Sequence, residues 1–345
     1  MTRLRNIVLG GIAALAIGSA ASSALAEESA SFENRLVAAT IGLPLGALPP
    51  PGLYTGLETA YLGMPVGTHT SGTFLPGGSQ AVLPAIANAV PLLWSTGYNF
   101  LGASFGMAVV QAWYLNTGCT LNTNCAGNGF FGQSGDYSIS GGDFTTANTT
   151  FSPIILSWNL GGGWFVSTGF TFMAPDGTKG ICTTCTVNTP NPDYWTFEIP
   201  FAVSYLGNNW NISGNFFYDI NSASNGTCCA MFPVTSGNLL YGDFHFLYKF
   251  GKWSIGPVGS FEVQTTADTG CSPSANALGI CNTLGAAGVG GLVGYDFGPV
   301  DLQIWVVDNV WSQNFPNSPG NLNVFTRLGF KLWGPEAPKP LVAKN

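Results

Sequence analysis

The chain has 345 residues, of which 46% are hydrophobic and only 8% are charged, and its 17 acidic residues outnumber its 10 basic ones. A soluble domain carries about 25% charged residues, and a nucleic-acid-binding protein needs basic grooves, so both classes are disfavoured. After the N-terminal segment no run of about eighteen apolar residues could form a spanning helix. A β-barrel with one face in lipid accounts for both the apolar composition and the missing helix.

The N-terminus has the organisation of a secretory signal peptide. Arg3 and Arg5 precede an apolar core over 7–17, and Ala24-Leu25-Ala26 provides small residues for cleavage. A transmembrane anchor is the alternative, but the core is too short and too rich in Gly and Ala. We therefore predict a signal peptide over 1–26 and a mature chain in the outer membrane of a Gram-negative bacterium.

A Pro-rich lead-in over 27–52 follows and ends in Pro49-Pro50-Pro51-Gly52. Three prolines cannot join a β-ladder, so this segment precedes the barrel. It hangs in the periplasm or folds up into the lumen, where it would constrict a path; the sequence leaves both open.

Segments of alternating polarity then predict the strands of an all-β, antiparallel transmembrane β-barrel over 53–333, followed by a tail over 334–345. About twelve strands are expected, an even number as in single-chain bacterial barrels. They lie near 53–64, 86–96, 100–116, 149–160, 164–174, 194–206, 210–221, 238–250, 253–265, 285–297, 300–312 and 322–333.

Short and long connections alternate between these strands. Tight turns are predicted at 97–99, 161–163, 207–209, 251–252 and 298–299. Long connections are predicted near 65–85, 117–148, 175–193, 222–237, 266–284 and 313–321. This asymmetry is typical of outer-membrane barrels, which have short periplasmic turns and long extracellular loops.

Period-two alternation separates the two faces of each strand. In 210–221, for example, Asn211, Ser213 and Asn215 share one face, and Trp210 and Ile212 the other. The polar face should line the lumen. The lumen-lining candidates are Glu58, Glu198, Asp219, Tyr241, Asp243, His245, Lys249, Glu262, Asp301, Arg327 and Lys331. They either rigidify a narrow barrel or set its selectivity, and their acidic excess predicts a mild cation preference.

Tryptophans stand at the predicted strand ends, beside turns or loops, as in the aromatic belts of membrane barrels. They are Trp164, Trp195, Trp210, Trp253 and Trp333. The alternative interpretation is a set of core tryptophans in a soluble β-sandwich.

Eight cysteines fall in the predicted long loops, and an even count behind a signal peptide indicates disulfides. They are Cys119, Cys125, Cys182, Cys185, Cys228, Cys229, Cys271 and Cys281. Pairing within one loop is favoured for 119 with 125, 182 with 185 and 271 with 281. The 228–229 pair forms a vicinal ring or bridges to 182 and 185. A zinc site built from those last four cysteines is a minor alternative, and no metal or cofactor is predicted.

An enzyme is disfavoured. His245 and Asp243 share a face two residues apart, but this face should point into the lumen, away from lipid substrates. The second histidine, His69, lies in a Gly/Thr-rich loop. The sequence shows no phosphate-binding loop and no Ser-centred nucleophile elbow.

Three stretches resemble the family called "protein involved in meta-pathway of phenol degradation", a group of proteobacterial outer-membrane barrels often described simply as transporters. They are residues 46–54, 194–198 and 294–298, and Asp219 and the Gly242-Asp243-Phe244-His245 stretch also fit. The resemblance runs from Gly46 to Trp333. It implies a channel for hydrophobic or aromatic molecules and transfers no residue roles. The cysteine-bearing loops and the tail after Trp333 depart from it.

The leading hypothesis is therefore passive uptake of small hydrophobic or aromatic compounds, with membrane lipid and the solute as partners and no nucleic acid. One alternative is a closed structural barrel whose disulfide-stiffened loops bind a surface partner. The other is a lumenal enzyme. The sequence does not give the oligomeric state.

Overall fold

The computed structural model describes residues 34–65, 85–116, 144–177, 192, 194–223, 235–270, 283–313 and 321–335. Its strands are β1 Gly52–Pro65, β2 Ala85–Phe100, β3 Ala103–Asn116, β4 Phe144–Thr146, β5 Thr149–Gly161, β6 Trp164–Ala174, β7 Thr196–Gly207, β8 Trp210–Asn221, β9 Leu239–Phe250, β10 Trp253–Gln264, β11 Gly285–Asp296, β12 Val300–Gln313 and β13 Asn321–Trp333. The predicted signal peptide, His69, all eight cysteines and most of the tail lie outside the described residues, so the predictions about them stay predictions.

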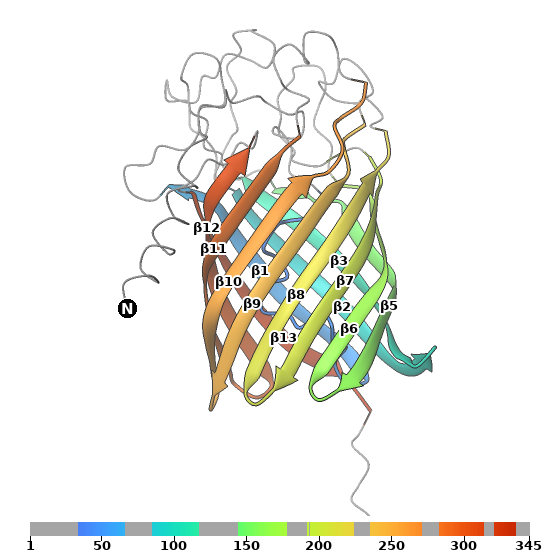
Figure 1. The fold of residues 1–345 in the computed structure, drawn as a ribbon, viewed down its shortest axis with the longest axis vertical. Helices are drawn as coiled ribbons and strands as arrows, with labels where there is room; N and C mark the ends of the chain where they lie inside the picture. The colour runs from blue at the N-terminus through green and yellow to red at the C-terminus, as the bar shows by residue number, and fades with distance from the viewer. Residues whose placement is uncertain are drawn as a thin grey trace, which may run out of the picture.

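The strands form one closed, antiparallel barrel, as predicted. Apart from the short β4, each strand pairs with its neighbours in the chain, β3 with β5 included, and β13 pairs with β1 to close the sheet (Figure 1). The short β4 pairs with β3 next to β5 and extends β5 along the same edge. The described part of the chain thus makes a twelve-stranded wall, and the all-β fold class is confirmed.

Tight turns join the strands at one rim, here called the turn end, and the opposite rim is the loop end (Figure 1). Between β7 and β8, Asn208 and Asn209 have φ of 51° and 66°, the positive values that a two-residue type I′ hairpin turn requires. The turn predicted at 97–99 was wrong. A bulge with Gly97 at φ 79° continues the hairpin, which turns at Leu101 and Gly102 instead.

The outer face of the wall is apolar, with exposed Leu, Ile, Val and Phe side chains on nearly every strand. Near the turn end, Trp–Tyr pairs join neighbouring strands: Trp164 with Tyr205, Trp210 with Tyr248, and Trp253 with Tyr295, with ring centroids 5.1, 5.0 and 4.7 Å apart. Such amphipathic rings suit a membrane–water interface. The described part of the chain holds no helix that could cross a bilayer.

The lead-in runs inside the barrel over its described residues 34–50. Asn34 bonds Thr196 at the loop end of β7, and Gly46 bonds Ser204 near the turn end of the same strand. The lead-in thus descends along the lumen and enters β1 at Gly52. Of the two placements that the sequence left open, the structure shows the lumenal one.

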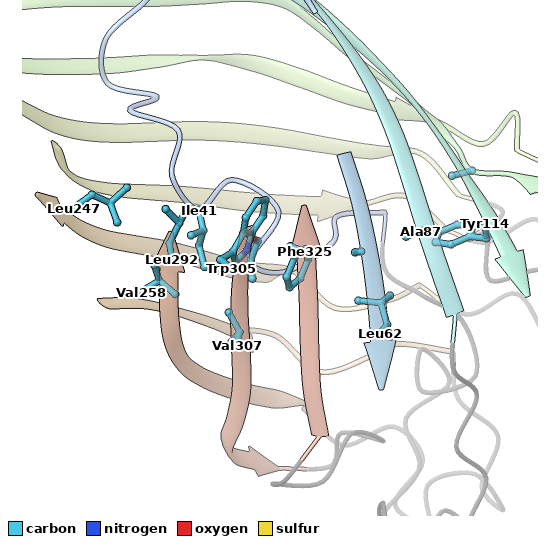
Figure 2. Packing of buried hydrophobic residues seen from close by; sticks show 13 residues of the cluster. Ile41, Leu62, Ala87, Tyr114, Leu247, Val258, Leu292, Trp305, Val307 and Phe325 are labelled. Carbon is cyan, nitrogen blue, oxygen red and sulfur yellow. The ribbon is translucent and has the colours of Figure 1, made fainter. Parts of the chain in front are cut away.

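A hydrophobic core forms where the lead-in meets the wall (Figure 2). Ile41 of the lead-in is fully buried, and it clusters with inward-facing Leu247, Leu292 and Trp305. The inward face of the wall is therefore not uniformly polar. The prediction that the polar face of each strand lines the lumen missed these inward-facing apolar residues on β9 to β13. It did not take into account that the lead-in packs against them.

Candidate functional site

Polar side chains of β8 and β9 bind the backbone of the lead-in. The Asp243 carboxylate accepts hydrogen bonds from the N–H groups of Ala38 and Thr40, both at 3.0 Å, and from the Thr40 hydroxyl at 2.6 Å. The Asn215 Nδ2 donates to the carbonyl oxygens of Thr40 and Leu43, both at 3.1 Å. These bonds satisfy backbone groups that would otherwise be orphaned in a dry interior.

His245 is engaged at both ring nitrogens. Its Nδ1 accepts the Gly42 N–H at 3.1 Å, so its Nε2 carries the proton and faces the Asn211 Oδ1 at 3.1 Å. The side chain is fully buried. The Asp243–His245 pair that the sequence singled out therefore holds the lead-in, and its geometry offers no ring nitrogen to a substrate.

Arg35 anchors the lead-in near the loop end of the barrel. Its Nε and Nη2 both meet the Glu198 carboxylate, with Nη2 to Oε1 at 2.7 Å. Its guanidinium carbon lies 3.5 Å from the centroid of the Phe217 ring. A bidentate pair with a stacked aromatic fixes both the position and the orientation of the guanidinium.

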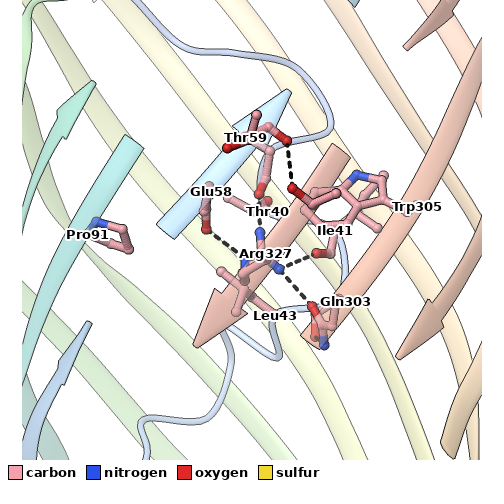
Figure 3. Close-up of polar contacts among 12 residues, drawn as sticks. Thr40, Ile41, Leu43, Glu58, Thr59, Pro91, Gln303, Trp305 and Arg327 are labelled. Carbon is pink, nitrogen blue, oxygen red and sulfur yellow. Dashed lines mark hydrogen bonds and ion pairs between the residues drawn. The ribbon is translucent and has the colours of Figure 1, made fainter. Parts of the chain in front are cut away.

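Arg327 of β13 makes the reverse contact, from the wall into the lead-in (Figure 3). Its Nε donates to the Glu58 Oε1 at 2.6 Å, and its Nη1 donates to the Ile41 carbonyl oxygen at 2.7 Å. Further bonds reach the Gln303 Oε1 at 2.9 Å and the Ala39 carbonyl oxygen. One side chain of β13 thus joins β1, β12 and the lead-in.

The remaining candidates fall into two groups. Asp219, Tyr241 and Glu262 are buried, and Tyr241 belongs to a hydrophobic cluster against which Val37 and Leu45 of the lead-in pack. Lys249 is exposed near the turn end, where Asp301 and Lys331 lie at the edge of a cavity.

This cavity, of about 960 Å³, separates the lead-in from the opposite wall. Its lining begins with Ala147 and Asn148 at the loop end and reaches Gly298 and Pro299 at the turn end, so it follows the length of the barrel. The wall side is built from β1, β2, β3, β5, β6, β7, β12 and β13 with Phe217 of β8, and the other side from the lead-in.

Small apolar side chains dominate the cavity wall on β2 and β3. They are Ala87, Ala89, Pro91, Leu93, Ala108, Val110 and Ala112. Sequence reasoning missed this strip because it searched for polar lumenal residues. The alternation of Ala87, Ala89, Pro91 and Leu93 with bulkier or polar neighbours was the signal that could have revealed it.

Charged side chains of both signs border the cavity. The acids that line it are Glu58, Glu198 and Asp301, and the bases are Arg35, Arg327 and Lys331. Two ion pairs, Arg35–Glu198 and Arg327–Glu58, neutralise four of them. Within the described residues, no group of three or more His, Cys, Asp and Glu side chains is placed to hold a metal ion.

Comparison with known proteins identifies a family. A family model described as "Putative MetA-pathway of phenol degradation" matches residues 67–322, well over half of the chain. A search of curated proteins finds no match.

Among solved structures, an outer membrane channel from Pseudomonas putida F1 superposes with a TM-score of 0.60 at 12% identity, covering 82% of this chain and 96% of that one. The NanC porin gives a TM-score of 0.41 at 9% identity, covering 81% and 100%. The toluene transporter TbuX from Ralstonia pickettii gives 0.38 at 10%, covering 90% and 98%. The first of these likenesses shows the outer-membrane barrel fold.

Proposed function

The chain belongs to the family described as "Putative MetA-pathway of phenol degradation", and from this membership and the lumen geometry we propose that it is an outer-membrane channel for small hydrophobic or aromatic compounds. One observation carries the proposal: a cavity of about 960 Å³ follows the barrel and has a small-residue apolar wall. Binding sites for small apolar molecules have this size and lining.

The lumen matches this solute class in its chemistry. Ala89, Leu93 and Val110 offer apolar contact, and hydroxyls such as Ser152 and Thr150 line the same space on β5. Such a lining favours a weakly polar solute over a strongly hydrated ion, because an ion loses water contacts that alanine cannot replace. The ion pairs Arg35–Glu198 and Arg327–Glu58 border the same space, and within each pair the two charges neutralise each other.

The test is conductance and uptake through the full chain with Ala89→Trp, which fills the cavity at its apolar wall. We expect this variant to lower single-channel conductance and aromatic-solute uptake roughly twofold or more, because pore-lining residues set the width of the path. Val90→Trp is the matched control, because the neighbouring Val90 faces outward and is 39% exposed.

A barrel that conducts nothing and takes up no aromatic solute would overturn the proposal and favour the closed structural barrel. Equal effects of the two variants would also contradict the proposal, because Ala89 lines the cavity and Val90 does not.

A further inference from the structure

The hairpin that joins β2 to β3 leaves the wall of the barrel at the turn end. Its ladder to β1 stops at Ser95, opposite Gly52, although β2 continues to Phe100. Its ladder to β5 stops at Ser104, opposite Ser157. Figure 1 shows the tip of the hairpin, drawn in teal, leaning outward from the barrel. Beyond these pairs, the tip has no neighbouring strand on either side within the described chain.

A β-bulge in β2 accounts for the outward lean. Ser95 pairs with Gly106, and the next pair joins Asn99 to Ser104, so β2 advances four residues while β3 advances two. Gly97 supplies a φ of 79° inside this bulge, a value that glycine adopts without a steric penalty. A bulge bends the strand that contains it and increases the local twist. The chain therefore turns away from the wall at this point.

Three hydrogen bonds hold the bulge and the tip in place. The Thr96 hydroxyl donates to the Phe105 carbonyl oxygen at 2.7 Å and accepts the Tyr98 N–H at 3.1 Å. The indole N–H of Trp158, on β5, donates to the Leu101 carbonyl oxygen at 3.1 Å. The hairpin is thus braced against the neighbouring strand while it leans away from the barrel.

The tip carries apolar side chains that no other part of the described chain covers. Tyr98, Phe100 and Leu101 are 73%, 57% and 78% exposed, and the values for Leu101 and Tyr98 are the highest among the large hydrophobic side chains of the described residues. The β7–β8 and β9–β10 turns at the same rim consist instead of 208–209, both Asn, and of 251–252, Gly and Lys. Those turns suit water, and the β2–β3 tip does not.

Two properties of the tip select its surroundings. Its apolar side chains, on a hairpin without a charged residue over 85–116, favour lipid over water. Its backbone groups that lack a ladder partner are, in contrast, costly in hydrocarbon. The headgroup region accommodates both, because side chains dip into the acyl chains there while backbone groups bond to water and headgroups. The Trp–Tyr pairs near the turn end indicate that this region lies at the same level.

We propose that residues 97–102 form an interfacial foot, which binds the phospholipid surface at the turn end of the barrel, the periplasmic surface in outer-membrane barrels. Because the tip leans outward, its side chains reach phospholipids beyond those that contact the wall. Interfacial aromatic residues set the tilt of membrane-spanning segments, and a contact outside the cylinder opposes tilting of the barrel toward this side. The role of the foot does not depend on which solute the channel carries.

The test places a photoreactive side chain on the tip of the full chain. Phe100→p-benzoylphenylalanine is introduced by amber suppression, intact Gram-negative cells are irradiated, and the purified protein is examined by mass spectrometry for phospholipid adducts. Lys252→p-benzoylphenylalanine is the matched control, because Lys252 is exposed in the β9–β10 turn at the same rim. We expect about tenfold more phospholipid adduct at Phe100 than at Lys252, since an aromatic ring at the interface lies among lipid and a turn in water does not.

A second variant separates the foot from general proximity to the membrane. Leu101→Asp combined with Phe100→p-benzoylphenylalanine should lower the adduct to the level at Lys252, because a carboxylate draws the tip toward water. Single-channel conductance should stay at the wild-type level in all these proteins.

An adduct between two copies of the chain, an adduct with another protein, or a phospholipid yield equal to that at Lys252 would overturn the foot and leave the channel function standing. An undiminished yield in the Leu101→Asp variant would overturn it too. Should the Phe100 variant not fold, as judged by heat-modifiable gel mobility, Leu101→p-benzoylphenylalanine takes its place, with the same expected and contradicting results. A wild-type protein that neither conducts nor takes up solute would contradict the channel function and leave the foot standing.

Discussion

The two halves of the lumen differ in what their inward side chains do. Along β8 and β9, inward residues such as Asn215, Asp243 and His245 bind the lead-in backbone, and the space is filled. Along β2 and β3, inward residues such as Ala89 and Val110 are small and apolar and contact a cavity. Hydrogen-bonding side chains on β8 and β9 thus mark a part of the lumen that the lead-in fills, and small apolar side chains on β2 and β3 mark the open part. A polar residue in a barrel lumen is thus no sign of a path for solute.

The largest effect should come from the Arg327 clamp, the set of bonds that this side chain makes with Glu58, Gln303 and the lead-in. Arg327→Met removes the bonds to Glu58, Gln303 and two lead-in carbonyl groups, and leaves Glu58 without its base. Loss of one partner from a buried ion pair costs about 3–5 kcal/mol of unfolding free energy. Denaturant unfolding followed by gel mobility measures it. Lys331→Met, at an exposed residue beside the cavity, is the control, and equal losses would contradict the clamp.

A smaller loss is expected from Asp243→Asn combined with Glu262→Gln. Asp243 holds two N–H groups and a hydroxyl of the lead-in, so its neutralisation should cost about 1–3 kcal/mol. Neither residue lines the cavity, and ion selectivity should therefore stay unchanged. Reversal potentials in a salt gradient measure selectivity. A shift toward anions without destabilisation would place both carboxylates in the conducting path after all.

One substitution made in both halves sharpens the contrast. Leu292 is 2% exposed and clusters with Ile41 in the core, so Leu292→Phe should overpack it and cost about 1–3 kcal/mol. Leu93 borders the cavity, so Leu93→Phe has room; it should keep its stability and lower conductance. Equal destabilisation by the two variants would show that the open half is packed as tightly as the filled one.

The smallest effect is expected at the turn end. Asp301 and Lys331 are the cavity charges outside the two ion pairs of the described residues. One acid and one base therefore remain, and their charges nearly balance. We expect a weaker cation preference than the acidic excess of the sequence predicted. Asp301→Asn should move the reversal potential slightly toward anions, and Lys331→Gln slightly toward cations, because single lining charges bias local ion concentration. Identical shifts in both variants would contradict this assignment.

Strand positions and strand faces were predictable because alternation is a local property. Asn211, Ser213 and Asn215 share the inward face of β8, and their burial follows the expected parity. The burial of Leu292 and Trp305 inside the lumen was not predictable, because parity says which way a side chain points and not what it meets. Only the path of the lead-in, set by contacts between residues more than a hundred positions apart, decides that.

The position of Arg327 bears on how the barrel is assembled. Glu58 of the first strand and Arg327 of the last stand directly opposite each other across the β1–β13 pairing, and the same guanidinium holds the carbonyl oxygens of Ala39 and Ile41. These two strands come from opposite ends of the described chain, so their pairing has the largest loop-closure cost. Because one side chain takes part in both contacts, we expect closure of the ring and seating of residues 34–50 to stabilise each other.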